Sequence, residues 1–211
     1  MNEFVFFPVI MELFLPAGIL GPDPTSYDVR AFLLPREGGV TLIDTGYDAD
    51  AAAIADALTE IGANWGDVSD VILTHGHVDH IGGLETVTAN APSATVWAGP
   101  GDTFPTPVRR VGDGDVIRGL RVLSTPGHTP GHLSLFEDTH KVLFVGDVVG
   151  NMHGQLVLAP AQFTDDAQES LRSLRRLSAQ RFDRLILSHG DELPDPAATL
   201  TALINSVDNP D

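Results

Sequence analysis

The sequence predicts an α/β fold built from two similar halves. Short apolar runs typical of buried strands alternate with stretches whose apolar residues recur every three to four positions, as in amphipathic helices. The chain also repeats itself, because Leu42-Ile43-Asp44 resembles Phe144–Asp147 and Val71–His77 resembles Arg184–Asp191. In each half a strand ending in aspartate precedes a helix, which precedes a strand ending in a histidine turn. The repeat is weak, but it predicts two strand-and-helix halves that face each other.

Apolar runs bounded by Gly, Pro and acidic residues predict the elements of the first half in order. We expect strands over residues 4–14, 29–34, 40–43, 71–73 and 94–98. Glycine and proline make residues 16–27 an irregular stretch. Its apolar part at 15–20 could line a substrate mouth, although packing against the body of the protein is the favoured interpretation. Asp48 or Asp50 is expected to cap a helix that presents Ile54 and Leu58 to the core. A short helix follows His80.

The same signals continue through the second half. We expect strands over residues 108–111, 116–123, 133–136, 142–145 and 184–187. A turn at Gly112-Asp113-Gly114 predicts that the first two of these pair antiparallel. Thr164 is expected to cap the next helix, and Asp195 followed by Pro196 to open the last one.

Length and composition predict a single domain over residues 1–211. The chain has 43% hydrophobic residues, which suffices for one buried core, and no composition shift marks a linker. Its net charge of −17 repels phosphate backbones, so we expect no nucleic-acid partner. No apolar run reaches the ~20 residues of a membrane span, and the first residues lack the basic segment and cleavage site of a signal peptide. We therefore expect a cytoplasmic protein that acts on a small molecule, and a homo-oligomer remains open.

A cluster of metal-capable residues follows the strand over 71–73. His75, His77, Asp79 and His80 fall within six positions, and Gly76 allows a tight backbone path. Because the chain has no cysteine, a metal would be held by imidazole nitrogen and carboxylate oxygen, which suit zinc and, in some settings, iron or manganese. The alternative is a surface loop that is rich in histidine by chance. That alternative does not explain why the cluster lies at a strand end, where open α/β proteins bind ligands.

Metal-capable residues also follow three later strands. His128 lies in the loop after residues 116–123, Asp147 follows 142–145, and His189 follows 184–187. Together with the first cluster they supply enough candidate ligands for two metal ions.

In combination, these motifs resemble the metallo-β-lactamase superfamily in its glyoxalase II-like, dinuclear form. The resemblance rests on His-x-His-x-Asp-His at 75–80, Gly-His-Thr-Pro-Gly-His at 127–132, Gly-Asp at 146–147 and Ser-His-Gly at 188–190, in the order of the family. It covers the chain from about residue 44 to residue 190. The resemblance implies an αββα sandwich, in which two mixed β-sheets pack face to face with helices on the outer faces and the halves are related by a pseudo-twofold axis.

The resemblance also implies a ligand set. The first metal would be bound by His75, His77 and His128. The second metal would be bound by Asp79, His80 and His189, with Asp147 as the bridge between them. Zinc is the first expectation, with iron or manganese as alternatives, because a site of nitrogen and oxygen ligands discriminates poorly between these metals.

Such a site implies hydrolysis. A water shared by two metal ions becomes hydroxide near neutral pH and attacks a carbonyl that a metal polarises. Asp79 would be the catalytic residue, since it would orient this metal-bridging hydroxide and transfer a proton. The acidic composition and the apolar stretch at 15–20 favour a small, largely neutral carboxyl ester, thioester or lactone as the substrate.

Four further residues leave alternatives open. Asp44 resembles the aspartate that lies beneath the site in the family and would hold a ligand imidazole in the correct tautomer, although a capping or turn role is the alternative. His132 is expected to make a structural hydrogen bond rather than a metal bond. His140 is expected to be solvated in a turn. His153 is a candidate for substrate contact, although an exposed loop position is the favoured interpretation.

Departures from individual family members narrow the activity. Asp147 stands where β-lactamases carry Cys or Ser, which disfavours antibiotic hydrolysis. No tyrosine follows Tyr47, which disfavours a homoserine lactone lactonase. The residues after His189 form no basic cluster, so glutathione thioesters are not singled out. A phosphodiesterase, a lactamase-type hydrolase on the same site and a non-catalytic metal-binding protein remain as alternatives.

Overall fold

The computed structural model describes residues 4–19 and 21–209. The chain divides into two compact units, residues 1–111 (unit 1) and residues 112–211 (unit 2). Each unit carries a mixed β-sheet and helices, so the predicted α/β class with two mixed sheets is confirmed. The prediction that both units form one domain over 1–211 stays a prediction.

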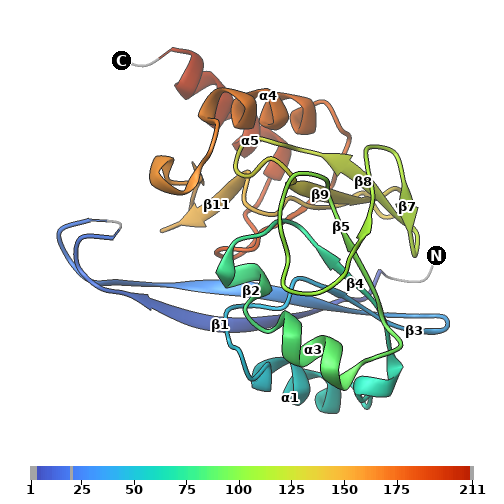
Figure 1. Cartoon of the computed structure of the whole chain (residues 1–211). Coiled ribbons are helices and arrows are strands. Elements are labelled where there is room, and N and C mark those ends of the chain that lie inside the picture. The colour runs from blue at the N-terminus through green and yellow to red at the C-terminus, as the bar shows by residue number, and fades with distance from the viewer. Residues whose placement is uncertain (1–3, 20, 210–211) are drawn as a thin grey trace. The chain divides into compact units, whose positions relative to one another are not determined.

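The sheet of unit 1 has the strand order β1-β2-β3-β4-β5-β6 (Figure 1). Its strands are β1 (Phe7–Leu15), β2 (Thr25–Arg36), β3 (Gly39–Ile43), β4 (Val68–Leu73), β5 (Thr95–Ala98) and β6 (Arg109–Arg110). β1, β2 and β3 are joined by antiparallel pairing, whereas β3 to β6 run parallel. The carboxyl ends of β3, β4 and β5 therefore lie along one edge of the sheet, where the segments that follow them can meet.

Helices α1 (Ala52–Glu60) and α3 (Leu84–Asn90) cover the same face of this sheet (Figure 1). Leu58 of α1 and Val87 of α3 are fully or almost fully buried in a core that includes Leu42 and Val71 of the sheet. The unit also contains the short helix α2 (Val78–Ile81) and the 3-10 helix η1 (Trp65–Asp67). The N-cap of α1 is Ala51, in the left-handed conformation and without a side-chain cap, and not Asp48 or Asp50 as expected. Asp48 still contacts the start of the helix, since its Oδ2 accepts the N–H of Ala52 at 3.2 Å.

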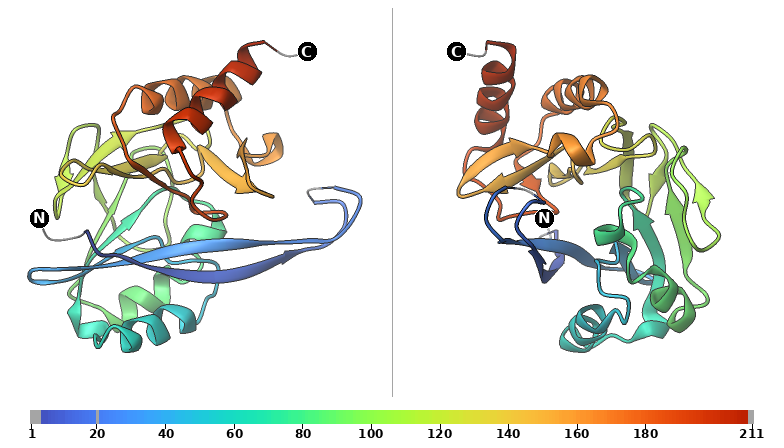
Figure 2. Two further views of the ribbon diagram at one scale, coloured as in Figure 1. Left: turned by 180° about the vertical axis from the view of Figure 1, so that it is seen from behind. Right: turned by 60° about the vertical axis from the view of Figure 1, so that its left-hand side comes forward.

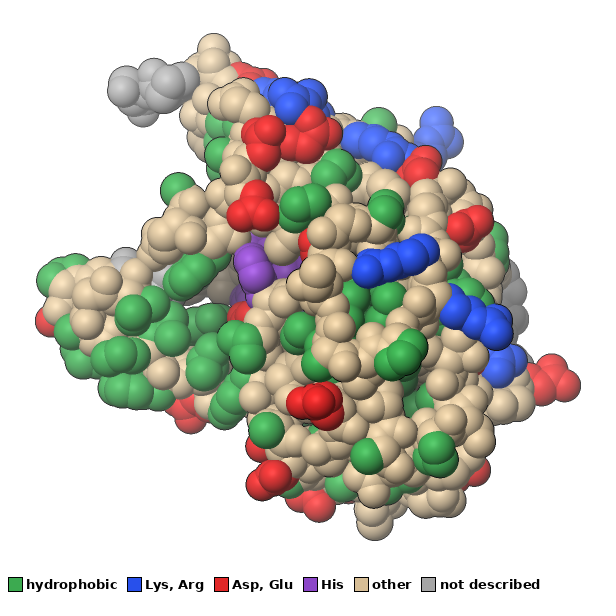
Figure 3. Space-filling model, in the orientation of Figure 1, with side chains coloured by type: hydrophobic (Ala, Val, Ile, Leu, Met, Phe, Trp, Pro, Cys, Tyr) green, Lys and Arg blue, Asp and Glu red, His purple; other side chains and the backbone are tan. Residues whose placement is uncertain are grey.

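The hairpin of β1 and β2 is longer than the sequence predicts. Pairing runs without interruption from Phe7 opposite Leu33 to Leu15 opposite Thr25, so the irregular stretch shrinks to residues 16–24, of which residue 20 lies outside the described residues. Cross-strand hydrogen bonds extend β2 into a segment that has no strand pattern of its own. Hydrophobic side chains gather over this hairpin (Figure 3), and Ile10 and Phe14 are 56% and 63% exposed.

The sheet of unit 2 has the strand order β13-β10-β9-β8-β7. Its strands are β7 (Val116–Ile117), β8 (Leu120–Ser124), β9 (Leu133–Glu137), β10 (Val142–Phe144) and β13 (Arg184–Ile186). β10 and β13 are parallel and the other pairs are antiparallel. A separate hairpin is formed by β11 (Val149–Met152) and β12 (Gln155–Leu158).

Helices α4 (Ala167–Ser178) and α5 (Pro196–Asp208) lie side by side in unit 2 (Figure 2). Leu177 of α4 and Leu200 of α5 are buried in a core that also contains Leu143. The cap of α4 is Asp166, whose side chain accepts the N–H of Glu169, and not Thr164 as expected. Thr164 instead ends the 3-10 helix η2 (Ala161–Phe163). None of the described helices has the length and hydropathy that crossing a membrane requires.

The prediction that residues 108–111 and 116–123 pair with each other was wrong. β6 pairs with β5 in the sheet of unit 1, whereas β7 pairs with β8 in the sheet of unit 2. β7 and β8 form a hairpin whose tight turn is Arg118-Gly119, where both residues have positive φ (49° and 82°). The Gly112–Gly114 turn thus separates two sheets instead of joining two strands of one.

The internal repeat is present in the structure. β3-α1-β4 and β10-α4-β13 are both parallel strand–helix–strand arrangements, with β11 and β12 inserted in the second. Ile43 pairs with Ile72, and Phe144 pairs with Ile186. By this register His75 and His189 occupy equivalent positions, three residues beyond Ile72 and Ile186.

Candidate metal centre

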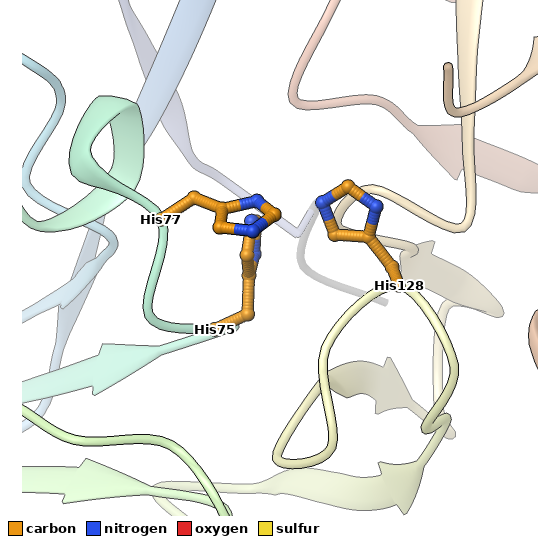
Figure 4. Close-up of side chains that lie close together, drawn as sticks. All are labelled: His75, His77 and His128. Carbon is orange, nitrogen blue, oxygen red and sulfur yellow. The ribbon is translucent and has the colours of Figure 1, made fainter. Parts of the chain in front are cut away.

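The first metal-capable cluster converges at the end of β4. His75 is buried in the loop that follows the strand, and His77, two residues further on, is the N-cap of α2 (Figure 4). The imidazole centroid of His75 lies 4.8 Å from that of His77 and 4.1 Å from that of His80. His80 Nε2 is 3.8 Å from Asp79 Oδ2. Unit 1 therefore brings together all four predicted ligands of the His75–His80 segment.

Asp44 lies directly beneath this cluster and is completely buried. Its Oδ1 accepts the N–H of Thr74 at 2.7 Å, and its Oδ2 accepts the Thr74 hydroxyl at 2.7 Å. His80 Nδ1 lies 2.8 Å from the same Oδ2. A carboxylate can only accept here, so His80 carries its proton on Nδ1. The Thr74 hydroxyl donates its only proton to Asp44, so it can only accept a hydrogen bond from His75 Nδ1, which lies 3.0 Å away. His75 therefore also carries its proton on Nδ1.

These hydrogen bonds leave Nε2 as the metal-binding nitrogen of both His75 and His80. The donor set of the cluster therefore consists of imidazole nitrogens in the correct tautomer and the carboxylate of Asp79. Such a set fits zinc, iron or manganese.

The turn that carries Asp44 is strained and held in place by α2. Asp44 has a φ of 58°, in the left-handed region that non-glycine residues rarely adopt. The N–H of Thr45 donates to the carbonyl oxygen of His80 at 2.7 Å, and the Thr45 hydroxyl donates to the same oxygen at 3.0 Å. The β3 turn and the His80 segment are thus tied by both side-chain and main-chain hydrogen bonds.

Asp102 is a contact of this cluster that the sequence did not reveal. Its Oδ2 accepts the N–H of Gly76, between His75 and His77, at 2.8 Å. Arg110 holds the loop of Asp102 from the other side, because its guanidinium donates to the Asp102 carbonyl oxygen at 2.8 Å and also to that of Gly99. In the sequence, Asp102 stands out only as an acidic residue in the loop after β5, the strand that pairs with β4.

A second cluster forms in unit 2 around Asp147. Its Oδ2 lies 3.5 Å from His128 Nε2 and 3.1 Å from His189 Nε2. The three predicted ligands of unit 2 therefore converge, although they come from the loops after β8, β10 and β13. Figure 4 shows the imidazole of His128 on its loop.

Tight backbone contacts fix the loops of His128 and His189. The N–H of Asp165, next to α4, donates to the carbonyl oxygen of His128 at 3.1 Å. Gly127 has a φ of 126°, and a Cβ there would lie 2.0 Å from the backbone nitrogen of Ser170. Asn151 of β11 donates its main-chain N–H to the carbonyl oxygen of His189 at 2.9 Å.

The remaining histidines are not part of either cluster. His132 is buried and hydrogen-bonded, which confirms the structural role expected for it. His140 lies in the β9–β10 turn as expected, with its side chain 31% exposed, and its Nδ1 lies 2.9 Å from Glu137 Oε2. His153 is exposed in the β11–β12 turn with a φ of 53°, which agrees with the favoured interpretation, and its contact with a substrate stays a prediction.

Comparison with known proteins agrees with the motifs. The family model of the metallo-beta-lactamase superfamily matches residues 25–189. The uncharacterized protein YobT of Bacillus subtilis is 26% identical over 86% of this chain and 91% of that protein. The hydroxyacylglutathione hydrolase of Stenotrophomonas maltophilia is 35% identical over 54% of this chain and 43% of its own length. The hydroxyacylglutathione hydrolase of Citrobacter koseri is 33% identical over 72% of this chain and 57% of its own length. The chain thus spans about half the length of these two hydrolases.

Solved structures show the same fold. A metallo-beta-lactamase family protein from Thermus thermophilus has a TM-score of 0.73 at 22% identity, covering 95% of this chain and 79% of its own. A metallo-beta-lactamase from Cronobacter sakazakii has a TM-score of 0.60 at 25% identity, covering 78% and 74%. Because the family model spans most of the sequence, including every predicted ligand from His75 to His189, this chain belongs to the metallo-beta-lactamase superfamily.

Proposed function

We propose that this chain is a metal-dependent hydrolase of small carboxyl esters, thioesters or lactones. The observation that carries the proposal is the position of the Asp147 carboxylate, with one oxygen 3.5 Å from His128 Nε2 and 3.1 Å from His189 Nε2. A carboxylate between two imidazoles can serve a different metal on each side. A closed structural site, by contrast, needs one set of four ligands and no bridge.

The ligand assignment combines the two units and is part of the proposal. The first metal would be held by His75, His77 and His128. The second metal would be held by Asp79, His80 and His189, and Asp147 would bridge the two. Membership of the superfamily and the order of the motifs support this assignment, as does the convergence of ligands within each unit. Zinc is the proposed metal, with iron or manganese as alternatives that the same donor set accepts.

In such a hydrolase, individual residues of this chain would have separate roles. Two bound metal ions would supply an activated water and polarise the carbonyl oxygen of the substrate. Asp44 keeps His75 and His80 in the tautomer that presents Nε2. Asp79 lies next to His80 Nε2 on α2, where its carboxylate can orient a water and accept its proton. This division requires no nucleophilic side chain.

Three features support the substrate class. The name of the related hydroxyacylglutathione hydrolases favours a thioester. The exposed apolar side chains Ile10 and Phe14 of the β1–β2 hairpin suit a neutral acyl group. A net charge of −17 disfavours polyanionic substrates. Residues 185–211 contain no Lys or Arg that could bind the carboxylates of glutathione.

Parallel assays on model substrates test the proposal. Turnover of p-nitrophenyl acetate, an aryl thioester and a γ-lactone would be compared with turnover of bis-p-nitrophenyl phosphate and the cephalosporin nitrocefin, each with and without a chelator. We expect chelator-sensitive cleavage of at least one carboxyl substrate. Cleavage of the phosphodiester or of nitrocefin alone would establish one of the alternative hydrolases, and binding of metal without any turnover would establish a non-catalytic protein.

A further inference from the structure

His132 is a buried histidine that the proposed ligand set does not use. It lies in the loop before β9, and each of its ring nitrogens has a close partner within unit 2. Nδ1 is 2.8 Å from the hydroxyl oxygen of Thr125, and Nε2 is 2.9 Å from the main-chain nitrogen of Asp147. The imidazole therefore connects the end of β8 to the turn that carries the proposed bridging carboxylate.

The directions of these hydrogen bonds fix the protonation of the ring. The N–H of Asp147 can only donate, so Nε2 of His132 must be unprotonated and accept. A neutral imidazole then carries its proton on Nδ1 and donates it to the Thr125 hydroxyl oxygen. That hydroxyl can pass its own proton on to Ser134 Oγ at 3.0 Å, because Ser134 donates to the carbonyl oxygen of Val145 at 2.9 Å. Each donated proton in this buried series of hydrogen bonds thus has one acceptor.

The turn around Asp147 is shaped to receive the ring edge. Gly146 has a φ of 61°, and a Cβ at this position would lie 2.5 Å from His132 Nε2. Glycine therefore allows the main chain to approach the imidazole closely enough for the Asp147 N–H to reach Nε2. The side chain of Asp147 then extends to His128 and His189.

We propose that His132 is a positioning residue that fixes Asp147 through the main chain. The neutral, Nδ1-protonated imidazole accepts the Asp147 N–H and so sets where the carboxylate is presented to the metals. An imidazole suits this position because its acceptor and its donor lie on opposite edges of a rigid ring, whereas an amide carries both on one end. The structural part of the proposal stands on unit 2 alone, and its effect on metal binding rests on the proposed function.

Nitrogen NMR of the metal-free full chain tests the tautomer directly. Long-range ¹H–¹⁵N spectra of ¹⁵N-histidine protein, assigned with a His132→Gln variant, would report both ring nitrogens. We expect Nδ1 of His132 to show the chemical shift of a protonated nitrogen and Nε2 that of an unprotonated one. Both chemical shifts should change little when zinc is added. A proton on Nε2, or a zinc-induced change characteristic of direct coordination, would overturn the proposal.

Substitutions at Thr125 test the effect on metal binding without removing the histidine. Thr125→Val keeps the size of the side chain but removes the acceptor of Nδ1–H, and Thr125→Ser keeps the hydroxyl. Zinc affinity, measured by competition with a chromophoric chelator, should fall about tenfold in Thr125→Val and stay near that of the parent in Thr125→Ser.

Thermal unfolding of the metal-free variants provides the folding check, because a merely structural role would lower the melting temperature of Thr125→Val without changing its zinc affinity. Parent-like zinc affinity in Thr125→Val would overturn the proposal. If instead the parent bound zinc with the expected tautomer and variant pattern but cleaved no carboxyl substrate, only the proposed function would fail.

Discussion

Asp44 shows how one side chain can set the chemistry of several others. It adopts a left-handed backbone conformation, which costs about 1 kcal/mol for a non-glycine residue. Its carboxylate accepts hydrogen bonds from the Thr74 N–H, the Thr74 hydroxyl and His80 Nδ1. Because these bonds determine two tautomers, the strained turn contributes to the metal-binding geometry as well as to the fold.

Replacing Asp44 by asparagine should weaken zinc binding. The substituted side chain would keep the shape of the original, but its amide can accept with one oxygen only and cannot receive all three hydrogen bonds. We expect zinc affinity to fall about 10- to 100-fold, as for other residues that orient metal ligands, in a chelator competition assay. Asp50→Asn, at an exposed position near the start of α1, is the matched control and should bind zinc like the parent. Unchanged affinity in Asp44→Asn would contradict the role assigned to Asp44.

Glu137 should make stability depend on pH in the acid range. Burial raises the pKa of this carboxyl, but hydrogen bonds from the main chain and ring of His140 and from Thr139 outweigh burial, and the pKa lies below its usual value of 4.5. A lowered pKa stabilises the folded state fully above about pH 4.5, and this contribution is lost as the pH falls through the folded-state pKa.

Glu137→Gln should therefore lower the free energy of unfolding at neutral pH and reduce its decline below pH 4.5. Urea unfolding at a series of pH values measures both effects. Glu85→Gln, on the exposed face of α3, is the control. An equal slope in the parent and in Glu137→Gln would show that the turn does not depend on this carboxylate.

At the scale of elements, the N-cap of helix α4 supports the loop of His128. The N–H of Asp166 donates to the carbonyl oxygen of Gly127 at 2.8 Å, and its side chain accepts the N–H of Glu169 at 2.9 Å. The same residue thus caps the helix and holds the ligand loop.

Asp166→Ala removes the cap while leaving the main-chain bond to Gly127. We expect a loss of about 1 kcal/mol in the free energy of unfolding, which is typical of a lost aspartate cap. Asp165→Ala, at the exposed neighbouring position, should change stability by less than about 0.5 kcal/mol. Chemical denaturation of both variants measures the difference, and equal stability of the two would argue against the cap.

Local patterns predicted those elements whose signals are contained in a short segment. Apolar runs ending in histidine or aspartate located β4, β10 and β13, and the repeat predicted their parallel strand–helix–strand arrangement. Long-range pairing was not visible in the same way. The strand character of residues 25–28 comes from β1, and the bond from Gly76 to Asp102 depends on the adjacency of β4 and β5.

The choice between nearby caps was also beyond the sequence. Thr164 and Asp166 are both good capping residues, and only the observed path of the chain after η2 places Asp166 at the N-cap of α4. The separation of β6 and β7 into different sheets likewise depends on tertiary pairing, since the turn residues at 112–114 fit a hairpin equally well.

For the whole molecule, the account depends on ligands that are divided between the two units. Unit 1 contributes His75, His77, Asp79 and His80, and unit 2 contributes His128, Asp147 and His189. Each set converges within its own unit, and each contains too few residues to hold two metals alone. The proposed function therefore requires both units to bind the same pair of ions, which would also join them into one domain.

Anomalous diffraction at the zinc edge from crystals of the zinc-loaded chain tests this requirement most directly. The account predicts two zinc peaks, one bound by His75, His77 and His128, the other by Asp79, His80 and His189, with Asp147 in contact with both. A single peak, or peaks bound by residues of one unit only, would contradict it.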